Sequence, residues 1–459
     1  MNTQELLDPE CWAKKTFGPS QLKDIRRTGR AVKAGTRIAE NASASLPAQM
    51  HTWKDVIALY RLLDEPDVTF EALMQPHWQQ TREQVAAHPV VLLVQDGTEL
   101  DLSRHHTMTG LGPIGKGTTR GLLLQTVLAV LPQSREVLGC ATQEAFVRLP
   151  IPTGETRSKR RQRAERETDV WMRLVSRLGR FPAETMTVHV GDRGADLFGF
   201  FEACQSTQSH FLVRLARNRR LAPEEADQQY LMEHIRSWQP TDSRPFQVPA
   251  THGRTARMTV VQLAFGPVTI LPPRLEKRYG PDPLSLWAIR VWEEQPPAGE
   301  EPLEWLLLTS VPTGTRADAW ERASWYECRW VVEDYHQCLK TGCRIEERQM
   351  HTADRLTRLL GLLSPVAVRL LQLRDLSRQE PDHLALQVVE ADLLAVVAAQ
   401  TGSSPASMTM ASFWQAVARM GGYLARRRDG PPGWKTLWAG WLRAQTLLEG
   451  VHLVTQLRL

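Results

Sequence analysis

The order of the apolar segments between residues 90 and 217 is the feature that most constrains the fold. Short apolar runs typical of buried strands come first, and helical and strand patterns then alternate. The predicted strands lie at 90–94, 121–131, 136–149, 185–190 and 211–217, and the predicted helices at 165–178 and 195–204. Three strands followed by helix, strand, helix and strand predict an α/β layer fold around a mixed sheet.

Different patterns lie on both sides of this core. Residues 1–75 predict short helices, whereas residues 218–304, rich in proline and charge with alternating stretches, predict a β-rich insertion. A strand at 304–309 and a long helix at 316–340 follow, and the remaining chain has helical patterns with a loop at 430–433. For 459 residues this organisation predicts three domains, at 1–75, 76–370 and 371–459.

Composition excludes several classes of protein. With 42% apolar and 23% charged residues, the chain is not mostly disordered. No stretch reaches the ~18 uninterrupted apolar residues of a membrane span, and the N-terminus is acidic and unlike a secretion signal, so we expect a soluble, cytosolic protein. The six cysteines form no Cys-x-x-Cys pair, and we expect neither structural zinc nor a metal at His105 and His106, which are more typical of a solvated turn.

Positive charge is concentrated in two segments. Residues 23–37 and 157–166 each carry six basic residues against one acid, although the whole chain has a net charge of only +5. Such clusters are typical of proteins that bind polyanions. A solvated loop is the alternative, and it suits 157–166, which has no apolar periodicity, better than 23–37, which predicts a helix.

Two aspartates and one glutamate are candidates for a functional site. Asp96 and Asp192 each follow a predicted buried strand, where α/β proteins bind their ligands. Taken singly, each aspartate is more typical of a turn or a helix N-cap. On the long helix, four residues at intervals of three, four and seven fall on one stripe, namely Tyr326, Arg329, Glu333 and Lys340. Asp334 lies about 100° off that stripe, and a surface helix with one ion pair is the alternative.

The combination of these residues indicates a chemistry. Two or three converging carboxylates suit a pair of Mg²⁺ ions, which prefer oxygen ligands. Two such ions about 4 Å apart can activate a water or hydroxyl and stabilise the leaving oxygen of an in-line phosphoryl displacement. Arginine and lysine beside the acids would hold the phosphate backbone.

Short motifs along nearly the whole chain resemble one family. They are DIRRTGR at 24–30, QDGT at 95–98, GDRGAD at 191–196, VR at 213–214, PLEWLLLTS at 302–310, Y-x2-R-x3-E-x6-K at 326–340, ERQM at 347–350, VAVRLLQLRD at 366–375 and GWKTLWAGW at 433–441. By these motifs the chain resembles the DDE-class transposases of bacterial insertion sequences, in the IS-four group, and is similar to the transposase of transposon five. The basic run 157–166 departs from that pattern.

The resemblance implies a fold and a reaction. The fold would be a ribonuclease-H-like catalytic core with a β-rich insertion, flanked by an N-terminal helical domain that binds DNA ends and a C-terminal helical domain for dimerisation. Asp96, Asp192 and Glu333 would form the catalytic triad and bind two Mg²⁺ ions, with Mn²⁺ as a substitute. The reaction would be cut-and-paste transposition, in which ends are nicked, hairpins form and open, and strands are transferred to target DNA.

Further residues are expected to contact DNA. Arg26, Arg27 and Arg30 lie within about one helical turn and are expected to read or clamp the terminal repeat. Trp305 alone is typical of a core aromatic, but the resemblance implies that it stacks on a base flipped out of the duplex. The other contacts expected near the cleavage site are Arg214, Tyr326, Arg329 and Lys340.

The implied partners are transposon-end DNA with its inverted repeats, target DNA and a second copy of the chain, in the bacterial cytoplasm at the nucleoid. The helical tail is the expected dimer interface because it concentrates the aromatic residues Trp414, Trp434, Trp438 and Trp441. The alternative is that these tryptophans cap a monomeric helical domain. Two alternatives for function also stay open: a two-metal nuclease or resolvase that cuts without joining, and a non-catalytic DNA-binding regulator, against which the three intact acids argue.

Overall fold

The computed structural model describes most of the chain. The described residues are 3–115, 117–148, 152, 154–156, 159, 166–223, 229–248, 257–274, 280, 282–297, 299–300, 302–378, 381–426 and 430–457. All of the basic run 157–166 except Lys159 and Arg166 therefore lies outside the described residues.

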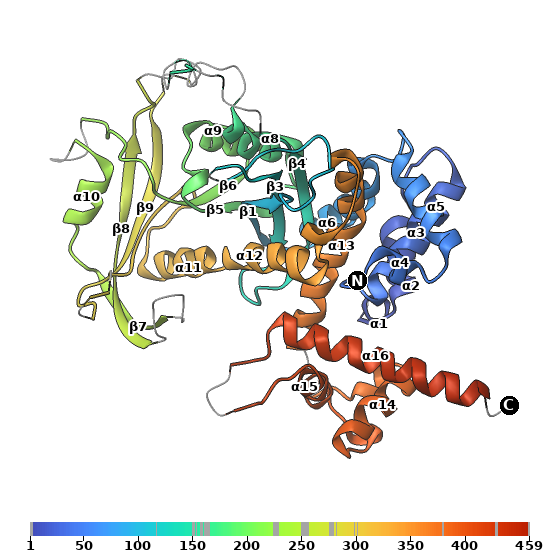
Figure 1. The fold of residues 1–459 in the computed structure, drawn as a ribbon. Coiled ribbons are helices and arrows are strands. Elements are labelled where there is room, and N and C mark those ends of the chain that lie inside the picture. Colours follow the sequence, from blue (N-terminus) through green and yellow to red (C-terminus); the bar gives the residue numbers. More distant parts are fainter. Residues whose placement is uncertain are drawn as a thin grey trace.

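A mixed sheet forms the centre of the molecule (Figure 1). Strand β3 (Arg120–Val130) pairs antiparallel with β1 (Val90–Asp101), β4 (Val137–Phe146) and the short β2 (Gly112–Pro113). Strands β5 (Met186–Gly191) and β6 (His210–Arg214) run parallel to β1. The resulting order β4-β3-β1-β5-β6 confirms the predicted α/β fold and agrees with the ribonuclease-H-like core that the resemblance implies.

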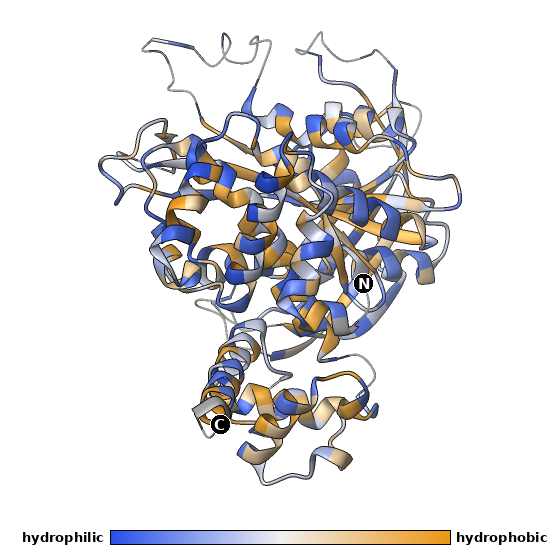
Figure 2. Ribbon diagram, turned by 90° about the vertical axis from the view of Figure 1, so that its right-hand side faces the viewer, coloured by the Kyte–Doolittle hydropathy of each residue, from blue (hydrophilic) through white to orange (hydrophobic). Residues whose placement is uncertain are grey.

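Helices cover both faces of this sheet, which is why its strands are apolar runs rather than alternating ones. Helices α8 (Val170–Leu178) and α9 (Phe198–Ser206) share one apolar core with Leu93 of β1. Residues on either side of Leu93 point the opposite way, and Leu92 and Val94 belong to the second core. That core includes α12 (Trp330–Gln337) and α13 (Ala353–Leu376). Figure 2 shows the apolar residues gathered along the strands between these helices.

The predicted β-rich insertion is confirmed, and it extends the central sheet. After the short helix α10 (Leu231–Ser237), β7 (Asp242–Val248), β8 (Arg257–Ile270) and β9 (Leu284–Glu293) form an antiparallel series. Strand β10 (Glu304–Thr309), which coincides with the predicted strand, joins β9 to β6. The insertion is therefore continuous with the central sheet through β10.

Two local predictions were wrong in detail. Asp96 does not follow its strand but lies inside β1, because the antiparallel pairing with β3 continues to Asp101 beyond the apolar run. The helix expected at 316–340 is divided into α11 (Arg316–Glu327), α12 and a π-helical turn η3 (Cys338–Gly342). Between α11 and α12 the backbone N–H groups of Cys328 and Arg329 bond to carbonyls three residues back, at 3.1 Å each. This tightened turn has no glycine or proline to mark it in the sequence.

The N-terminal part is helical, as predicted. It contains α1 (Thr3–Leu7), α2 (Pro9–Phe17), α3 (Ile25–Glu40), α4 (Leu46–Met50), α5 (Trp53–Asp64) and α6 (Phe70–Ala86). Helix α13 is long and apolar enough to cross a membrane, but 83% of its most apolar window is buried inside the fold. Its fully buried Arg369 donates hydrogen bonds to the carbonyl oxygens of Leu6, Leu7 and Ala39. Arg369 therefore ties the N-terminal helices to the central helix of the core.

The C-terminal part consists of α14 (Ala391–Thr401), α15 (Met410–Met420) and α16 (Trp434–Leu457). The tryptophans expected to form a dimer interface are buried inside the chain: Trp414, Trp434, Trp438 and Trp441 are all 7% exposed or less. The rings of Trp414 and Trp441 stack with centroids 5.5 Å apart. Trp414 and Trp441 thus join α15 to α16, and the ring of Trp434 lies against Gly342 of η3. The four buried side chains correspond to the alternative interpretation of the sequence and cannot themselves cover a second chain.

Arg369→Met should lower the free energy of unfolding by about 2–4 kcal/mol, because three buried carbonyls lose their donor while the aliphatic volume is kept. Chemical denaturation of the full chain measures this change. The exposed Arg61, changed in the same way, should shift stability by less than about 0.5 kcal/mol. Equal stability of the two variants would contradict a structural role for Arg369.

Candidate active site

Asp96 and Asp192 lie side by side because two parallel strands end their pairing at the same level. The last paired residues of β1 and β5 are Gln95 and Gly191, and each is followed by an aspartate. Asp192 begins the 3₁₀ turn η2 (Arg193–Ala195), and its Oδ1 accepts a hydrogen bond from the Gly194 N–H at 2.7 Å. Asp96 Oδ1 accepts one from its neighbour Gly97 N–H at 2.7 Å. Backbone donors thus orient both carboxylates.

The turn after β5 is tight, and glycine permits it. A Cβ on Gly191 would overlap the Cβ of Ala195, which the turn brings back against the strand. The chain can therefore reverse at once after β5, and Asp192 stays at the end of the strand beside Asp96.

Glu333 approaches from the helix that crosses this edge of the sheet, and Arg329 connects it to Asp96. Arg329 Nη1 lies 3.2 Å from Asp96 Oδ2, and Nη2 lies 2.7 Å from Glu333 Oε1. The adjacent Asp334 points elsewhere and pairs with Arg374 of α13 at 2.7 Å. The structure thus brings Asp96, Asp192 and Glu333 together and leaves Asp334 out, which agrees with the helical stripe in this part of the sequence.

The electrostatics of the three acids favour an added cation. Burial, reinforced by the charges of Asp192 and Glu333, raises the pKa of Asp96 to about 6, against the opposing effects of the Gly97 N–H and Arg329. Within the described residues, no three His, Cys, Asp or Glu side chains already form a metal cage. The carboxylate oxygens nevertheless form a donor set suited to Mg²⁺, and Asp96, Asp192 and Glu333 are the residues that could hold it.

Basic and aromatic side chains, here called the basic wall, lie next to these acids: Arg214, Arg329, Tyr326 and Trp305. Arg214, at the end of β6, donates from Nη2 to the Glu304 carbonyl at 2.9 Å, and burial lowers its pKa. The Tyr326 hydroxyl is buried near Arg214 and Arg329, and its pKa is raised chiefly by that burial. Trp305 on β10 is half-buried, with its ring edge-on to Tyr326 at 5.6 Å between centroids. Four of the predicted DNA contacts, Arg214, Trp305, Tyr326 and Arg329, are therefore neighbours around the acids.

Lys340 does not belong to this group. It lies in η3, donates from Nζ to the Glu99 carbonyl at 2.5 Å and pairs with Glu346 at 3.3 Å. The π-helical geometry of η3 and these contacts place Lys340 farther along β1, beside Glu99 rather than Asp96. The helical stripe therefore predicts the position of Glu333 but not that of Lys340.

The three N-terminal arginines have different environments. Arg26 is 83% exposed in its side chain, and Arg30 is exposed as well. Arg27 is 22% exposed and pairs with Glu65 and with Asp67, the latter at 3.0 Å. Arg26 and Arg30 are thus available to a ligand, whereas Arg27 fastens the start of α3 to the loop after α5.

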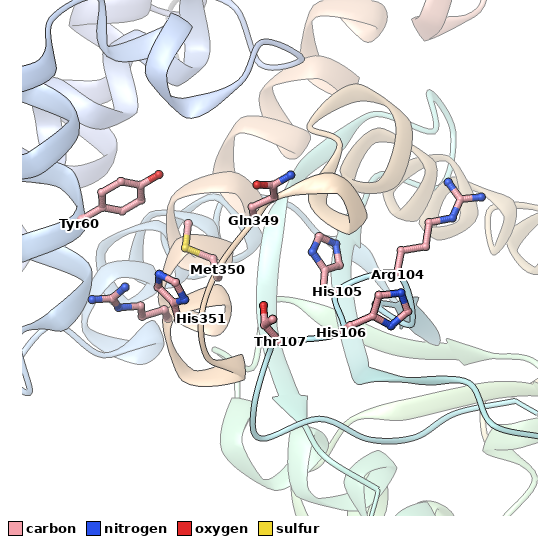
Figure 3. A pocket seen from close by; sticks show the side chains of 9 residues that line it. Tyr60, Arg104, His105, His106, Thr107, Gln349, Met350 and His351 are labelled. Carbon is pink, nitrogen blue, oxygen red and sulfur yellow. The ribbon is translucent and has the colours of Figure 1, made fainter.

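A cavity of about 640 Å³ opens between the N-terminal helices and the core (Figure 3). Tyr60 faces it from α5, the 104–107 loop contributes Arg104, His105 and His106, and His351 lies on the segment before α13. His105 was expected in a solvated turn, but its Nε2 lies 2.8 Å from the Glu346 carbonyl oxygen and its ring lines the cavity. Sequence reasoning missed this site because its residues come from three separate segments.

Comparison with protein families gives two matches. Residues 9–68 match a family described as transposase DNA-binding, and they include α2, α3 and α5. Residues 156–368 match a family described as transposase DDE domain. The second match includes Asp192 and Glu333 and begins beyond Asp96, so the first acid is placed by the structure alone.

Asp96→Asn should stabilise the metal-free protein at pH 7.5, by about 1–3 kcal/mol. The ionised Asp96 carboxylate destabilises the folded protein fully above the folded-state pKa of about 6, and not at all below the ordinary pKa of 3.8. The gain in stability from Asp96→Asn should therefore vanish near pH 4. Thermal unfolding in a chelator at both pH values measures it. Asp101→Asn is the control, since Ser103 lowers the pKa of Asp101; a pH-independent gain for Asp96→Asn would refute this reading of the site.

Proposed function

The chain belongs to the DDE transposases, which are metal-dependent enzymes that cleave DNA and join its strands, and we propose that it moves an insertion sequence by cut-and-paste transposition. The observation that carries the proposal is the meeting of Asp96, Asp192 and Glu333 at one edge of the sheet. We place the chain in the IS-four group, with relatives of the transposon-five type, on the motifs between residues 24 and 441. Its steps would be end nicking, hairpin formation, hairpin opening and strand transfer.

The acids and the basic wall divide the chemistry between them. Two Mg²⁺ ions, or Mn²⁺ in their place, held by Asp96, Asp192 and Glu333 would supply an activated water or 3′-hydroxyl and neutralise charge on the leaving oxygen. Arg329 and Arg214 would bind the phosphate that carries the scissile bond, because a guanidinium matches phosphate oxygens with two donors. Lys340 would contact the backbone farther from the metal site.

Trp305 would capture a base when the hairpin forms. A hairpin bends one strand back on the other, and unstacking a base to allow this costs a few kcal/mol. Stacking on an aromatic ring returns about 1–3 kcal/mol per base. Trp305 is half-buried and braced edge-on by Phe246 and Tyr326, so one face of a fixed ring can serve as the platform.

End recognition would use the exposed side of α3 and the cavity beneath the N-terminal helices. Arg26 and Arg30 are the exposed cations on α3, and Arg27 would act by holding that helix in place. The Arg104 and histidine side chains of the cavity would contact backbone phosphates of the same duplex between α5 and the core.

The protein would act as a dimer in the bacterial cytoplasm, at the nucleoid, because two ends must be paired before they are cut. The buried tryptophans cannot form the interface, but α16 has another apolar stripe. Leu447, Val451 and Val454 are spaced by four and three residues and are 37%, 49% and 50% exposed. We propose this stripe as the contact with the second copy.

Asp96→Ala, Asp192→Ala and Glu333→Ala should each abolish cleavage of a duplex carrying the inverted repeat that flanks the gene, while binding of that duplex stays within about threefold, because phosphate and base contacts elsewhere hold DNA. Mg²⁺ and Mn²⁺ should support cleavage and Ca²⁺ only poorly. Asp334→Ala is the matched control and should cleave. An active Glu333→Ala variant would reassign the third acid. Pre-cut ends that bind but never join to target DNA would make the protein a nuclease.

Arg26→Ala and Arg30→Ala should weaken binding of the terminal repeat more than binding of unrelated DNA if they read bases. If they only clamp phosphates, affinity for both DNAs should fall equally and each variant should reduce the salt slope by about one. Arg27→Ala should instead lower stability as well as affinity, since Glu65 and Asp67 both lose their ion pair with Arg27, although Asp67 still pairs with Lys23. Fluorescence anisotropy at several salt concentrations, together with thermal melting, separates these effects. If the double variant Arg26→Ala with Arg30→Ala binds the terminal repeat with full affinity, this face of α3 does not contact the DNA.

Trp305→Ala should fold and nick nearly normally but form hairpins at least about tenfold more slowly, because the stacking free energy is lost at that step only. An abasic site at the flipped position should partly restore the rate by removing the unstacking cost. Timed gel assays of nick and hairpin products measure both. Equal loss of nicking and hairpin formation would mean that Trp305 is simply a core residue.

A further inference from the structure

Arg329 already occupies the position of a counter-ion between two of the acids. Its two terminal nitrogens pair with Asp96 and Glu333, at 3.2 and 2.7 Å, and its side chain is only 11% exposed. Its Nε is buried and has no hydrogen-bond partner among the described residues. The carboxyls that would bind metal are thus held by a guanidinium whose own donors are incompletely satisfied.

The surroundings of the same guanidinium suit an anionic ligand. The guanidinium lies 4.8 Å from the ring centre of Trp330, which is 53% exposed. Arg214 lies close enough to Arg193 and Arg329 for their positive charges, together with burial, to lower its pKa. Arg214 is thus repelled by two neighbouring cations, and an anion that bound between Arg214 and Arg329 would relieve this repulsion. A phosphate also offers Arg329 a bidentate partner as good as the carboxylates that it would leave.

We propose that Arg329 and the divalent metal are alternative counter-ions of Asp96 and Glu333, and that a DNA phosphate releases these acids for metal by binding Arg329. The proposal rests on the proposed function for the identity of the DNA, but the exchange itself concerns the free protein. Thermodynamic linkage makes this coupling reciprocal. If DNA increases the affinity for metal by some factor, metal increases the affinity for DNA by the same factor. The arrangement would keep the metal site weak until a scissile phosphate is present.

The exchange is tested by Mn²⁺ binding to the full chain, followed by electron paramagnetic resonance of free Mn²⁺ without DNA. Arg329→Gln and Arg329→Met should each bind Mn²⁺ about tenfold more tightly than the wild type. The reason is that each variant removes one positive charge a few ångströms from the divalent ion, and even in a water-like dielectric the lost repulsion has about this effect. Arg329→Lys keeps the charge and should stay near the wild type. Two neutral variants are used so that one failure to fold, checked by thermal melting, leaves the test intact.

The matched control is Arg135→Gln, which removes an arginine that pairs with Glu327 on the neighbouring helix at 2.6 Å and touches none of the three acids. It should bind Mn²⁺ as the wild type does. The proposal is overturned if the neutral Arg329 variants bind Mn²⁺ no more tightly than the wild type, or if Arg135→Gln tightens binding as much as they do.

A second titration adds a pre-cut duplex with a 5′-phosphate, which can enter the site but cannot be cut. DNA should tighten Mn²⁺ binding by the wild type at least about fivefold more than binding by Arg329→Gln, whose acids are already free. Equal tightening in both would refute the gating role of Arg329. A duplex that binds neither protein would instead count against the proposed function, while the titration without DNA would still decide the exchange.

Discussion

The parallel pairing of β1 with β5 is the constraint on which the rest of the site depends. The two strands stop pairing at Gln95 and Gly191, so the next residue of each is a carboxylate at the same edge of the sheet. Burial and this enforced proximity raise the pKa of Asp96 to about 6. A sheet that puts two acids together needs positive charge there, whether from Arg329, a metal ion or both, and the surrounding arginines follow from that requirement.

A buried polar network holds helix α12, which carries Glu333, against the sheet. Gln143 of β4 donates to the Tyr335 hydroxyl at 3.0 Å and to Thr126 Oγ1 of β3 at 2.9 Å, and it accepts from the Ser364 hydroxyl of α13 at 2.7 Å. Tyr335 stands two residues after Glu333 on α12. Such a network is stable only when every member is satisfied, so it fixes the distance of α12 from the sheet. Arg369 plays the same part between α13 and the N-terminal helices.

The sequence predicted what periodicity and local spacing encode. The apolar runs predicted β1, β3, β4, β5 and β6 of the core and the strand at 304–309, but not the short β2. The i, i+4 spacing predicted that Arg329 and Glu333 lie on the same stripe of the helix, where the structure pairs them. It could not predict properties that depend on distant partners. Arg27 has the same sequence environment as Arg26 and Arg30, and only the fold brings Glu65 and Asp67 to it. Lys340 departs from the stripe because it lies in the π-helical turn η3, which regular helical spacing does not predict. The tail tryptophans suggested an interface, whereas packing within the chain buries them.

The central claim is that Asp96, Asp192 and Glu333 form one metal site. Anomalous diffraction from crystals of the protein with Mn²⁺ and a pre-cut duplex tests it most directly. The account predicts two Mn²⁺ peaks about 4 Å apart among these three carboxylates, with the Arg329 guanidinium on a phosphate oxygen instead of Glu333. Mn²⁺ bound only elsewhere, such as at the histidines of the cavity below the N-terminal helices, or bound while Arg329 still pairs with both acids, would contradict it.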